Sequence, residues 1–142
     1  MPPLSSIRPG LRASRVRSGP SLLPKFHVPL SAYVVDCGDF YLASITECLG
    51  TKALVADAMR SVSGRTFYDL IAQDTLAMAI NDIITVGATP ISVHAYWASG
   101  GSDWFADAER ARDLVDGWRA ACDRCGVAWG GGETPALAGV VE

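Results

Sequence analysis

Asp74, Asn81 and Asp82 lie in a largely apolar stretch, residues 70–86. If this stretch is helical, it is apolar nearly all round, which is typical of a buried helix. Asp74 and Asn81 are seven residues apart and point the same way, and Asp82 lies within about 100° of them. Carboxylates on a buried face are costly unless they are paired or bind a cation. The pattern therefore predicts a cation site or, as a plainer alternative, two helix-end acids that reach solvent.

A second charged turn carries Glu47 and Lys52. Residues 40–46 are typical of a strand and residues 53–61 of a helix, and Gly50-Thr51-Lys52 joins the two. The backbone amides at a helix N-terminus bind anions well. The spacing is not that of a Walker P-loop, and an ordinary strand–helix turn explains Gly-Thr-Lys equally well.

Three glycines precede a single carboxylate near the end of the sequence. Residues 127–129 predict a short strand, and the run Gly-Gly-Gly-Glu-Thr follows at residues 130–134. Glycines let a backbone approach a ligand closely, which would place Glu133 beside that ligand; a flexible turn is the alternative. Oxygen ligands on these turns suit Mg²⁺, which commonly bridges carboxylates to nucleotide phosphates. Lys52 would neutralise phosphate charge, so the residues alone predict a magnesium–phosphate site on an α/β domain.

The remaining elements are predicted to position these turns. Residues 91–97 alternate as a strand does, and His94 within them is expected to pack or hydrogen-bond across strands rather than catalyse. A helix capped by Ser102 or Asp103 is predicted to run to residue 125, before Gly126. Its apolar side chains recur at steps of four and three and form one stripe that packs on a sheet: Trp104, Ala108, Ala111, Val115, Trp118, Cys122 and Cys125.

Composition bounds the class of protein. A length of 142 residues is enough for one domain with a hydrophobic core of ordinary size. No apolar run is long enough to span a membrane. Residues 1–34 hold five basic side chains and no acid, whereas the rest hold seven basic and all fifteen acidic ones. An acidic body argues against nucleic acid as the main partner. Residues 1–32 are predicted to be a disordered or loosely docked arm; a transit peptide or a misassigned start are the alternatives.

The four cysteines do not form a disulfide framework. No secretory signal precedes them, so reduced thiols and a cytoplasmic location are expected. Cys122 and Cys125 form a CxxC motif without a second pair at zinc-ribbon spacing. We interpret both as buried structural cysteines.

In their order and spacing these motifs resemble aminoimidazole ribonucleotide (AIR) synthetase, the phosphoribosylformylglycinamidine cyclo-ligase of purine synthesis. The resemblance covers residues 41–139 and is carried by five motifs: Gly50-Thr-Lys52, Asp74-x-x-Ala-Met-x-x-Asn81-Asp82-Ile, Gly87-Ala-x-Pro90, Tyr96-Trp-Ala-Ser-Gly100 and Gly131-Gly-Glu-Thr134. The wider superfamily includes formylglycinamidine ribonucleotide synthetase, selenophosphate synthetase, thiamine-phosphate kinase and a hydrogenase maturation protein. The Gly-Gly-Glu-Thr form points to the cyclo-ligase.

The resemblance implies an α+β fold, the N-terminal domain of that family over residues 33–142, with a mixed or antiparallel sheet covered by helices. That sheet would pair with the sheet of a second subunit in a homodimer. ATP would activate the formyl amide oxygen as an iminophosphate before a ring nitrogen closes the imidazole. By position, the catalytic residues would be Lys52 and Asp74; the nucleotide-binding residues Gly50, Thr51, Lys52, Asn81, Gly131, Gly132 and Thr134; and the Mg²⁺ ligands Glu47, Asp74, Asp82 and Glu133.

The sequence also departs from the family pattern. Glu47 and Cys48 replace the Asp and Gly of the family's Asp-Gly-Val-Gly-Thr-Lys motif, and Ala95 and Ala136 fall where the family has acids. The family's second domain does not follow, and we expect it to be supplied by a partner or lost by truncation. Two hypotheses result: a whole or partial cyclo-ligase, and a catalytically degenerate domain kept for dimerisation or nucleotide binding. Thiamine-phosphate kinase-like or selenophosphate-like activity is a lesser alternative.

Overall fold

The structure, a computed structural model, describes residues 31–141, so the predicted basic arm lies outside the described residues except for Ser31 and Ala32. The elements follow one another as two strands, two helices, a strand, two helices and a strand. Their bounds are β1 Tyr33–Asp36, β2 Tyr41–Ser44, α1 Lys52–Ser63, α2 Tyr68–Thr85, β3 Ser92–Tyr96, α3 Asp103–Ala106, α4 Ala108–Cys125 and β4 Ala128–Glu133.

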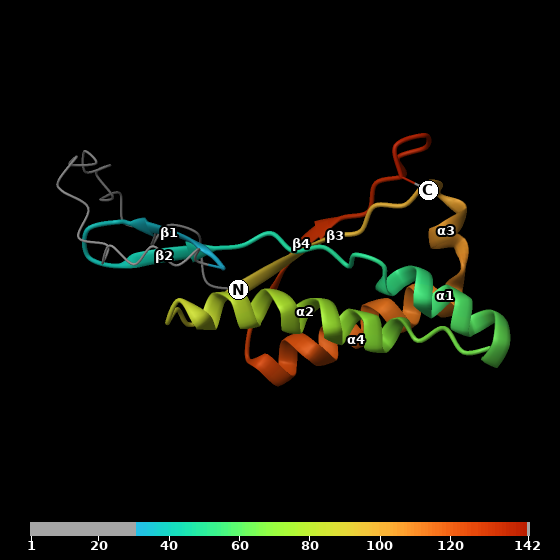
Figure 1. Cartoon of the computed structure of the whole chain (residues 1–142), viewed down its shortest axis with the longest axis horizontal. Helices are drawn as coiled ribbons and strands as arrows, with labels where there is room; N and C mark the ends of the chain where they lie inside the picture. The colour runs from blue at the N-terminus through green and yellow to red at the C-terminus, as the bar shows by residue number, and fades with distance from the viewer. Residues whose placement is uncertain (1–30, 142) are drawn as a thin grey trace, which may run out of the picture.

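The strands form two separate pairs. Strands β1 and β2 make an antiparallel hairpin, and β3 pairs with β4 in parallel. The hairpin projects beyond one end of the helices (Figure 1). The predicted α+β class is confirmed, but among residues 31–141 the predicted single sheet is replaced by two small ones. In the part of the chain that the structure describes, the hairpin is continuous with neither β3 nor β4, and no further strand pairs with its edges.

The core lies where α2 packs against α4, and Ala95 of β3 also belongs to it. Its largest members are Tyr68 and Leu76 from α2 and Leu114 and Trp118 from α4, each at most 4% exposed. Gly117 lies at the crossing point, because a Cβ atom there would be 2.5 Å from the carbonyl oxygen of Asp69. The absence of a side chain therefore sets how closely the two helices approach.

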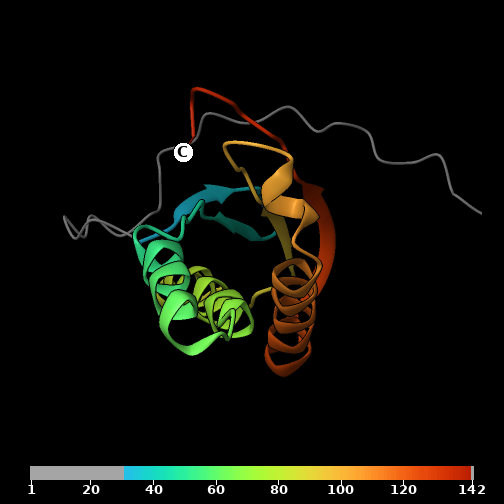
Figure 2. The same ribbon diagram turned by 90° about the vertical axis from the view of Figure 1, so that its right-hand side faces the viewer.

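The apolar pattern of α2 led to one wrong expectation. The helix is present over nearly the predicted range, but only Tyr68, Ala72 and Leu76 are buried, whereas Leu70 and Ile84 are each about half exposed. A helix that is apolar all round is expected to be covered on every side. In this chain α2 is covered mainly on the side facing α4 (Figure 2).

The long helix predicted from Ser102 or Asp103 to residue 125 is in fact two helices. Asp107 has extended backbone angles and separates α3 from α4, where its side chain accepts a hydrogen bond from the Arg110 backbone N–H. Because the helix is interrupted at Asp107, side chains on α3 and α4 do not share one continuous face. The single apolar stripe predicted from Trp104 to Cys125 is therefore wrong in part. Leu114 and Ala121 are buried on α4, whereas Val115 and Cys125 are exposed. Cys122 is buried as predicted, and Cys125 is not.

The triple glycine is part of a strand rather than a turn. Strand β4 continues through Gly132 to Glu133, and residue 132 pairs with Ala95. A Cβ atom on Gly132 would lie 1.9 Å from the Ala95 carbonyl oxygen, and one on Gly130 would lie 2.5 Å from the His94 ring. Glycine is thus required by close approach to β3. His94 packs across strands, as predicted.

Candidate functional site

Lys52 and Asp74 meet between the first two helices. The Lys52 ammonium at the start of α1 lies 2.7 Å from Asp74 Oδ2 in the middle of α2. The Lys52 Nζ atom also lies 2.8 Å from the Met78 sulfur, one turn along α2. Both residues were predicted to form the site, and the structure pairs them directly.

This ion pair is open to solvent. The Lys52 side chain is 35% exposed and the Asp74 side chain 58% exposed. The prediction of a costly buried carboxylate at Asp74 is therefore wrong, because α1 covers the side of α2 that carries Asp74 only in part. The plainer alternative, an acid that reaches solvent, is correct for Asp74, and the amide of Asn81 is exposed as well. An exposed pair remains available to an incoming ligand.

The N-terminus of α1 has features that favour an anion. Gly50 turns the chain with φ +59°, and Thr51 is the N-cap but makes no side-chain capping bond. The first turn contains no acidic side chain, so the positive end of the helix dipole is not neutralised locally. Thr51 and Lys52 line a small groove of about 310 Å³ between α1 and α2, together with Val55, Ala56, Met59, Phe67, Leu70 and Ile71.

Glu47 and Gly50 belong to a different concavity. A cavity of about 2140 Å³ lies between the hairpin, α1, α2 and β3, and residues 40–50 form one wall of it. The opposite wall includes His94, Ala95 and Trp97. Figure 2 shows these elements arranged around the long axis of the chain. The cavity is predominantly apolar, and Glu47 at its rim is exposed.

The other predicted residues lie at separate places. Asp82 is near the C-terminal end of α2, where its backbone oxygen accepts hydrogen bonds from the hydroxyls of Ser31 (3.0 Å) and Thr85 (2.7 Å). Glu133 ends β4 with an exposed side chain, while its carbonyl oxygen accepts a 2.9 Å hydrogen bond from the Trp97 N–H. Gly131 and Gly132 precede it in β4, and Thr134 follows, also exposed.

Within residues 31–141, no three His, Cys, Asp or Glu side chains are grouped closely enough to hold a metal ion. No side-chain hydrogen bond or ion pair in that part of the chain joins Glu47, Asp82 or Glu133 to the Lys52–Asp74 pair. Magnesium usually takes one or two carboxylates together with substrate phosphates. The four acids predicted as ligands therefore remain a prediction, and the described chain groups only Asp74 with Lys52.

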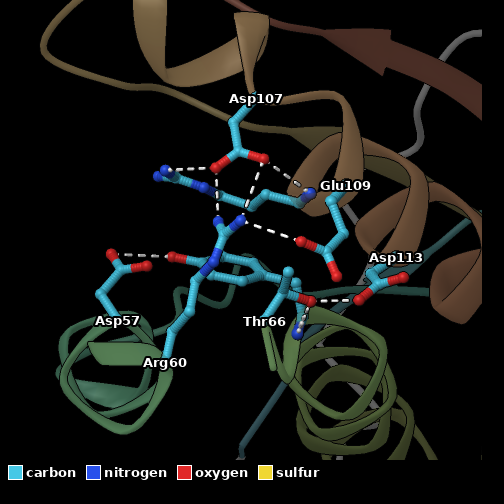
Figure 3. A network of polar contacts seen from close by, with 8 residues as sticks. Asp57, Arg60, Thr66, Asp107, Glu109 and Asp113 are labelled. Carbon is cyan, nitrogen blue, oxygen red and sulfur yellow. Dashed lines mark hydrogen bonds and ion pairs between the residues drawn. The ribbon is translucent and has the colours of Figure 1, made fainter. Parts of the chain in front are cut away.

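A network of charged side chains that the sequence did not indicate joins α1, α2 and α4 (Figure 3). We call it the helix clamp and define it as Asp57, Arg60, Tyr68, Asp107, Glu109 and Arg110. Arg60 forms ion pairs with Asp107 and, at 3.0 Å, with Glu109. The Tyr68 hydroxyl donates a 3.1 Å hydrogen bond to Asp57. Beside the clamp, the buried Thr66 hydroxyl donates to Asp113.

Two members of the clamp have strongly displaced pKa values. The hydrogen bond from the Arg60 guanidinium, followed by that from the Arg110 backbone N–H, holds the pKa of Asp107 well below its usual range. Burial, followed by the negative charge of Asp57, raises the pKa of Tyr68 to about 12. Tyr68 is therefore a hydrogen-bond donor and Asp107 a carboxylate throughout the neutral range.

The described part of the chain contains no helix long and apolar enough to cross a membrane.

Comparison with known proteins gives one family. Residues 31–140 match the family described as AIR synthase related protein, N-terminal domain. The chain is 37% identical over 111 residues to the phosphoribosylformylglycinamidine cyclo-ligase of Thermococcus kodakarensis, a match covering 78% of the chain and 30% of that protein. It is 33% identical over 111 residues to the cyclo-ligase of Methanobrevibacter smithii, with the same coverage.

A further relative is the trifunctional purine biosynthetic protein adenosine-3 of Gallus gallus. It is 35% identical over 102 residues, which is 72% of the chain and 9% of that protein. The chain thus matches about 30% of the length of the single-function relatives.

Proposed function

The chain belongs to the family of AIR synthase related proteins, through their N-terminal domain, and we propose that it supplies the N-terminal part of a phosphoribosylformylglycinamidine cyclo-ligase. In this proposal the chain binds ATP and Mg²⁺ for the ring closure of formylglycinamidine ribonucleotide to aminoimidazole ribonucleotide, a step of purine synthesis. The observation that carries it is the Lys52–Asp74 pair, 2.7 Å apart, at the start of a helix within a family match over residues 31–140.

The donor set of this pair suits a magnesium nucleotide. An ammonium group neutralises phosphate oxygens, and a carboxylate is a preferred oxygen ligand of Mg²⁺. Lys52 and Thr51 would face the phosphates, with the first backbone amides of α1 directed at the same charge. Asp74 would ligate Mg²⁺ or position the nucleotide, with Asn81 on the same face of α2. Glu47, Asp82 and Glu133 would complete the set of ligands.

Mg²⁺ would neutralise charge on the phosphates. ATP would phosphorylate the formyl amide oxygen and so convert that oxygen into a leaving group. The residues of the chain would contribute by positioning and electrostatic stabilisation rather than by a covalent nucleophile. Lys52 in particular would exchange part of its contact with Asp74 for a phosphate oxygen. The exposure of both side chains permits that exchange.

We also propose that the chain forms a homodimer through the hairpin. Tyr33, Phe40 and Tyr41 are each more than half exposed on β1, β2 and the turn that joins them. Exposed apolar side chains on a small, unpaired sheet are typical of a protein–protein interface. Because the chain spans about 30% of its curated relatives, the remaining elements of the site would come from a second domain, in the same cytoplasmic setting.

A degenerate domain kept for dimerisation or nucleotide binding is the second candidate. It is favoured by Ala95, which occupies a family acid position and is 5% exposed. The other such position, Ala136, lies in an isolated bridge to Ser99.

Turnover distinguishes the two candidates. The purified chain is incubated with formylglycinamidine ribonucleotide, ATP and Mg²⁺, with and without the remaining part of a cyclo-ligase relative supplied as a separate protein. Substrate-dependent ADP release that is lost in Lys52→Met supports the cyclo-ligase. ATP binding without substrate-dependent ADP release under either condition supports the degenerate domain.

A further inference from the structure

We propose that Arg60 and Asp107 are positioning residues for the nucleotide site, because their ion pair fixes the orientation of α1 and hence the place of Lys52. The inference rests on the proposed function of Lys52 and Asp74. Neither Arg60 nor Asp107 is expected to touch the nucleotide.

Helix α1 has little apolar attachment to the rest of the chain. In the part of the chain that the structure describes, Ala56 is its one buried residue. Val55, Met59 and Val62 recur along one side of the helix, and each is at least 46% exposed. Burial of apolar surface is what usually holds a helix in place. Polar side chains must therefore contribute much of what fixes the orientation of α1.

Those polar contacts lie along one face of α1. Lys52, Ala56 and Arg60 are spaced four residues apart, which places them above one another on a helix. Lys52 pairs with Asp74 on α2 at one end, and Arg60 pairs with Asp107 at the other. Asp57, which follows Ala56 in the chain, accepts a hydrogen bond from the Tyr68 hydroxyl. Lys52 and Arg60 are eight positions apart, a rise of about 12 Å along the helix, so a tilt at Arg60 displaces Lys52.

Asp107 is a rigid anchor for Arg60. As N-cap of α4 it accepts from the Arg110 backbone N–H at 3.2 Å and from the Arg110 guanidinium at 3.1 Å. Arg110 is in turn held over the Trp104 ring, 4.7 Å from its centroid. Figure 3 shows Arg60 reaching from α1 to Asp107 and Glu109 at this point. Arg60 therefore binds an acid whose own position is fixed by the start of α4.

Variants at the two ends of the ion pair test this role. Arg60→Gln removes the charge, and Arg60→Lys restores it with fewer donors. Asp107→Asn removes the opposite charge while keeping an N-cap oxygen for the Arg110 N–H. Arg119→Gln is the matched control, because Arg119 pairs with Asp116 at 3.0 Å within α4 itself and links no two elements.

Two quantities are measured on the full chain at a temperature where circular dichroism shows each variant folded. The first is the dissociation constant for MgATP by calorimetry, and the second is amide hydrogen exchange of residues 52–56. We expect Arg60→Gln and Asp107→Asn to weaken MgATP binding by about tenfold or more, the effect of a misplaced binding group. Exchange of residues 52–56 should accelerate in both, Arg60→Lys should recover part of the affinity, and Arg119→Gln should match the original chain.

The inference is overturned if Arg60→Gln and Asp107→Asn bind MgATP with unchanged affinity, or if Arg119→Gln loses as much. If the original chain does not bind MgATP at all, the proposed function fails for this chain. Hydrogen exchange then decides the structural part by itself: acceleration at residues 52–56 in Arg60→Gln and Asp107→Asn alone supports it, and unchanged exchange contradicts it.

Discussion

The helix clamp and the β1–β2 hairpin differ in how far their side chains are paired and buried within the chain. In the clamp, Arg60 pairs with two acids, and Tyr68, 1% exposed, donates to Asp57. In the hairpin, Tyr33, Phe40 and Tyr41 are 72%, 61% and 56% exposed. The clamp is thus complete within the chain. The hairpin presents apolar surface that remains exposed among the described residues.

The predicted site lies between these two regions and shares features of both. Lys52 and Asp74 are paired, as in the clamp, but they are exposed, as in the hairpin. Glu47 lies on the hairpin side and Glu133 at the end of β4, without side-chain partners among the described residues. The contrast indicates that the helices are the preformed part of the site. Under the proposed function, the surface beside the hairpin would be the part that contacts another molecule.

The largest expected effect separates the core from the hairpin. Leu76→Ala removes a side chain that is fully buried against α4, and we expect it to lower the free energy of unfolding by about 2–5 kcal/mol. Tyr41→Ser, on the hairpin, should change the monomer's free energy of unfolding by no more than about 0.5 kcal/mol. Chemical denaturation at low protein concentration measures both. A loss above 2 kcal/mol in Tyr41→Ser would break the comparison.

The next effect tests the helix crossing on which the clamp depends. A Cβ atom at Gly117 would lie 2.5 Å from the Asp69 carbonyl oxygen and 2.6 Å from its Cα. Since backbone cannot yield as a side-chain tip does, we expect Gly117→Ala to cost about 1–3 kcal/mol. Gly38→Ala, in the hairpin turn, is the control. Its φ of +92° strains an alanine backbone, but an added Cβ atom there would meet no other atom within 4 Å. Equal unfolding midpoints for Gly117→Ala and the original chain would contradict the close crossing.

A smaller effect concerns Asp107 and depends on pH. Loss of this N-cap in Asp107→Ala should cost about 1 kcal/mol near neutral pH. Because the folded-state pKa of Asp107 is held below its ordinary value, its contribution is fully present above about pH 4 and is lost as the pH falls through the folded-state pKa. The difference between the two proteins should therefore shrink in acid. A difference that grows as the pH falls would refute the assignment.

The smallest expected effect on stability is at Asp74. Exposed ion pairs contribute little, so Asp74→Asn should leave the free energy of unfolding within about 0.5 kcal/mol. The same variant should lose magnesium-dependent ATP binding if Asp74 ligates the ion. Equilibrium dialysis with labelled ATP measures the second quantity. Unchanged affinity for MgATP would show that the role assigned to Asp74 is wrong.

The sequence allowed the elements to be predicted where a local pattern determines them. The helix predicted over residues 53–61 is α1, and the pattern around Gly50 and along α2 indicates Lys52 and Asp74, which the structure pairs. The start of α4 was missed, because Ser102 and Asp103 are capping residues as suitable as Asp107. The extension of β4 through Gly131 and Gly132 was missed as well, because the partner strand β3 determines it rather than the residues themselves.

The clamp could not be predicted at all. Arg60 and Asp107 are separated by 47 positions, and a charged residue on a helix carries no local sign of its distant partner. The exposure of Asp74 also differs from the prediction, because the apolar pattern of a helix indicates cover on every side. That inference fails for the described residues, in which α2 is covered mainly by α4.

The most direct test of the proposed site is thermal unfolding of the purified chain with ATP, in excess Mg²⁺ and in excess EDTA. A ligand that binds only the folded state stabilises it by about 2.7 kcal/mol at one hundred times its dissociation constant. We predict a rise in the midpoint with ATP and Mg²⁺ that EDTA abolishes and that Lys52→Met lacks. No rise at millimolar ATP, or an equal rise in EDTA, would contradict a magnesium–nucleotide site at Lys52 and Asp74.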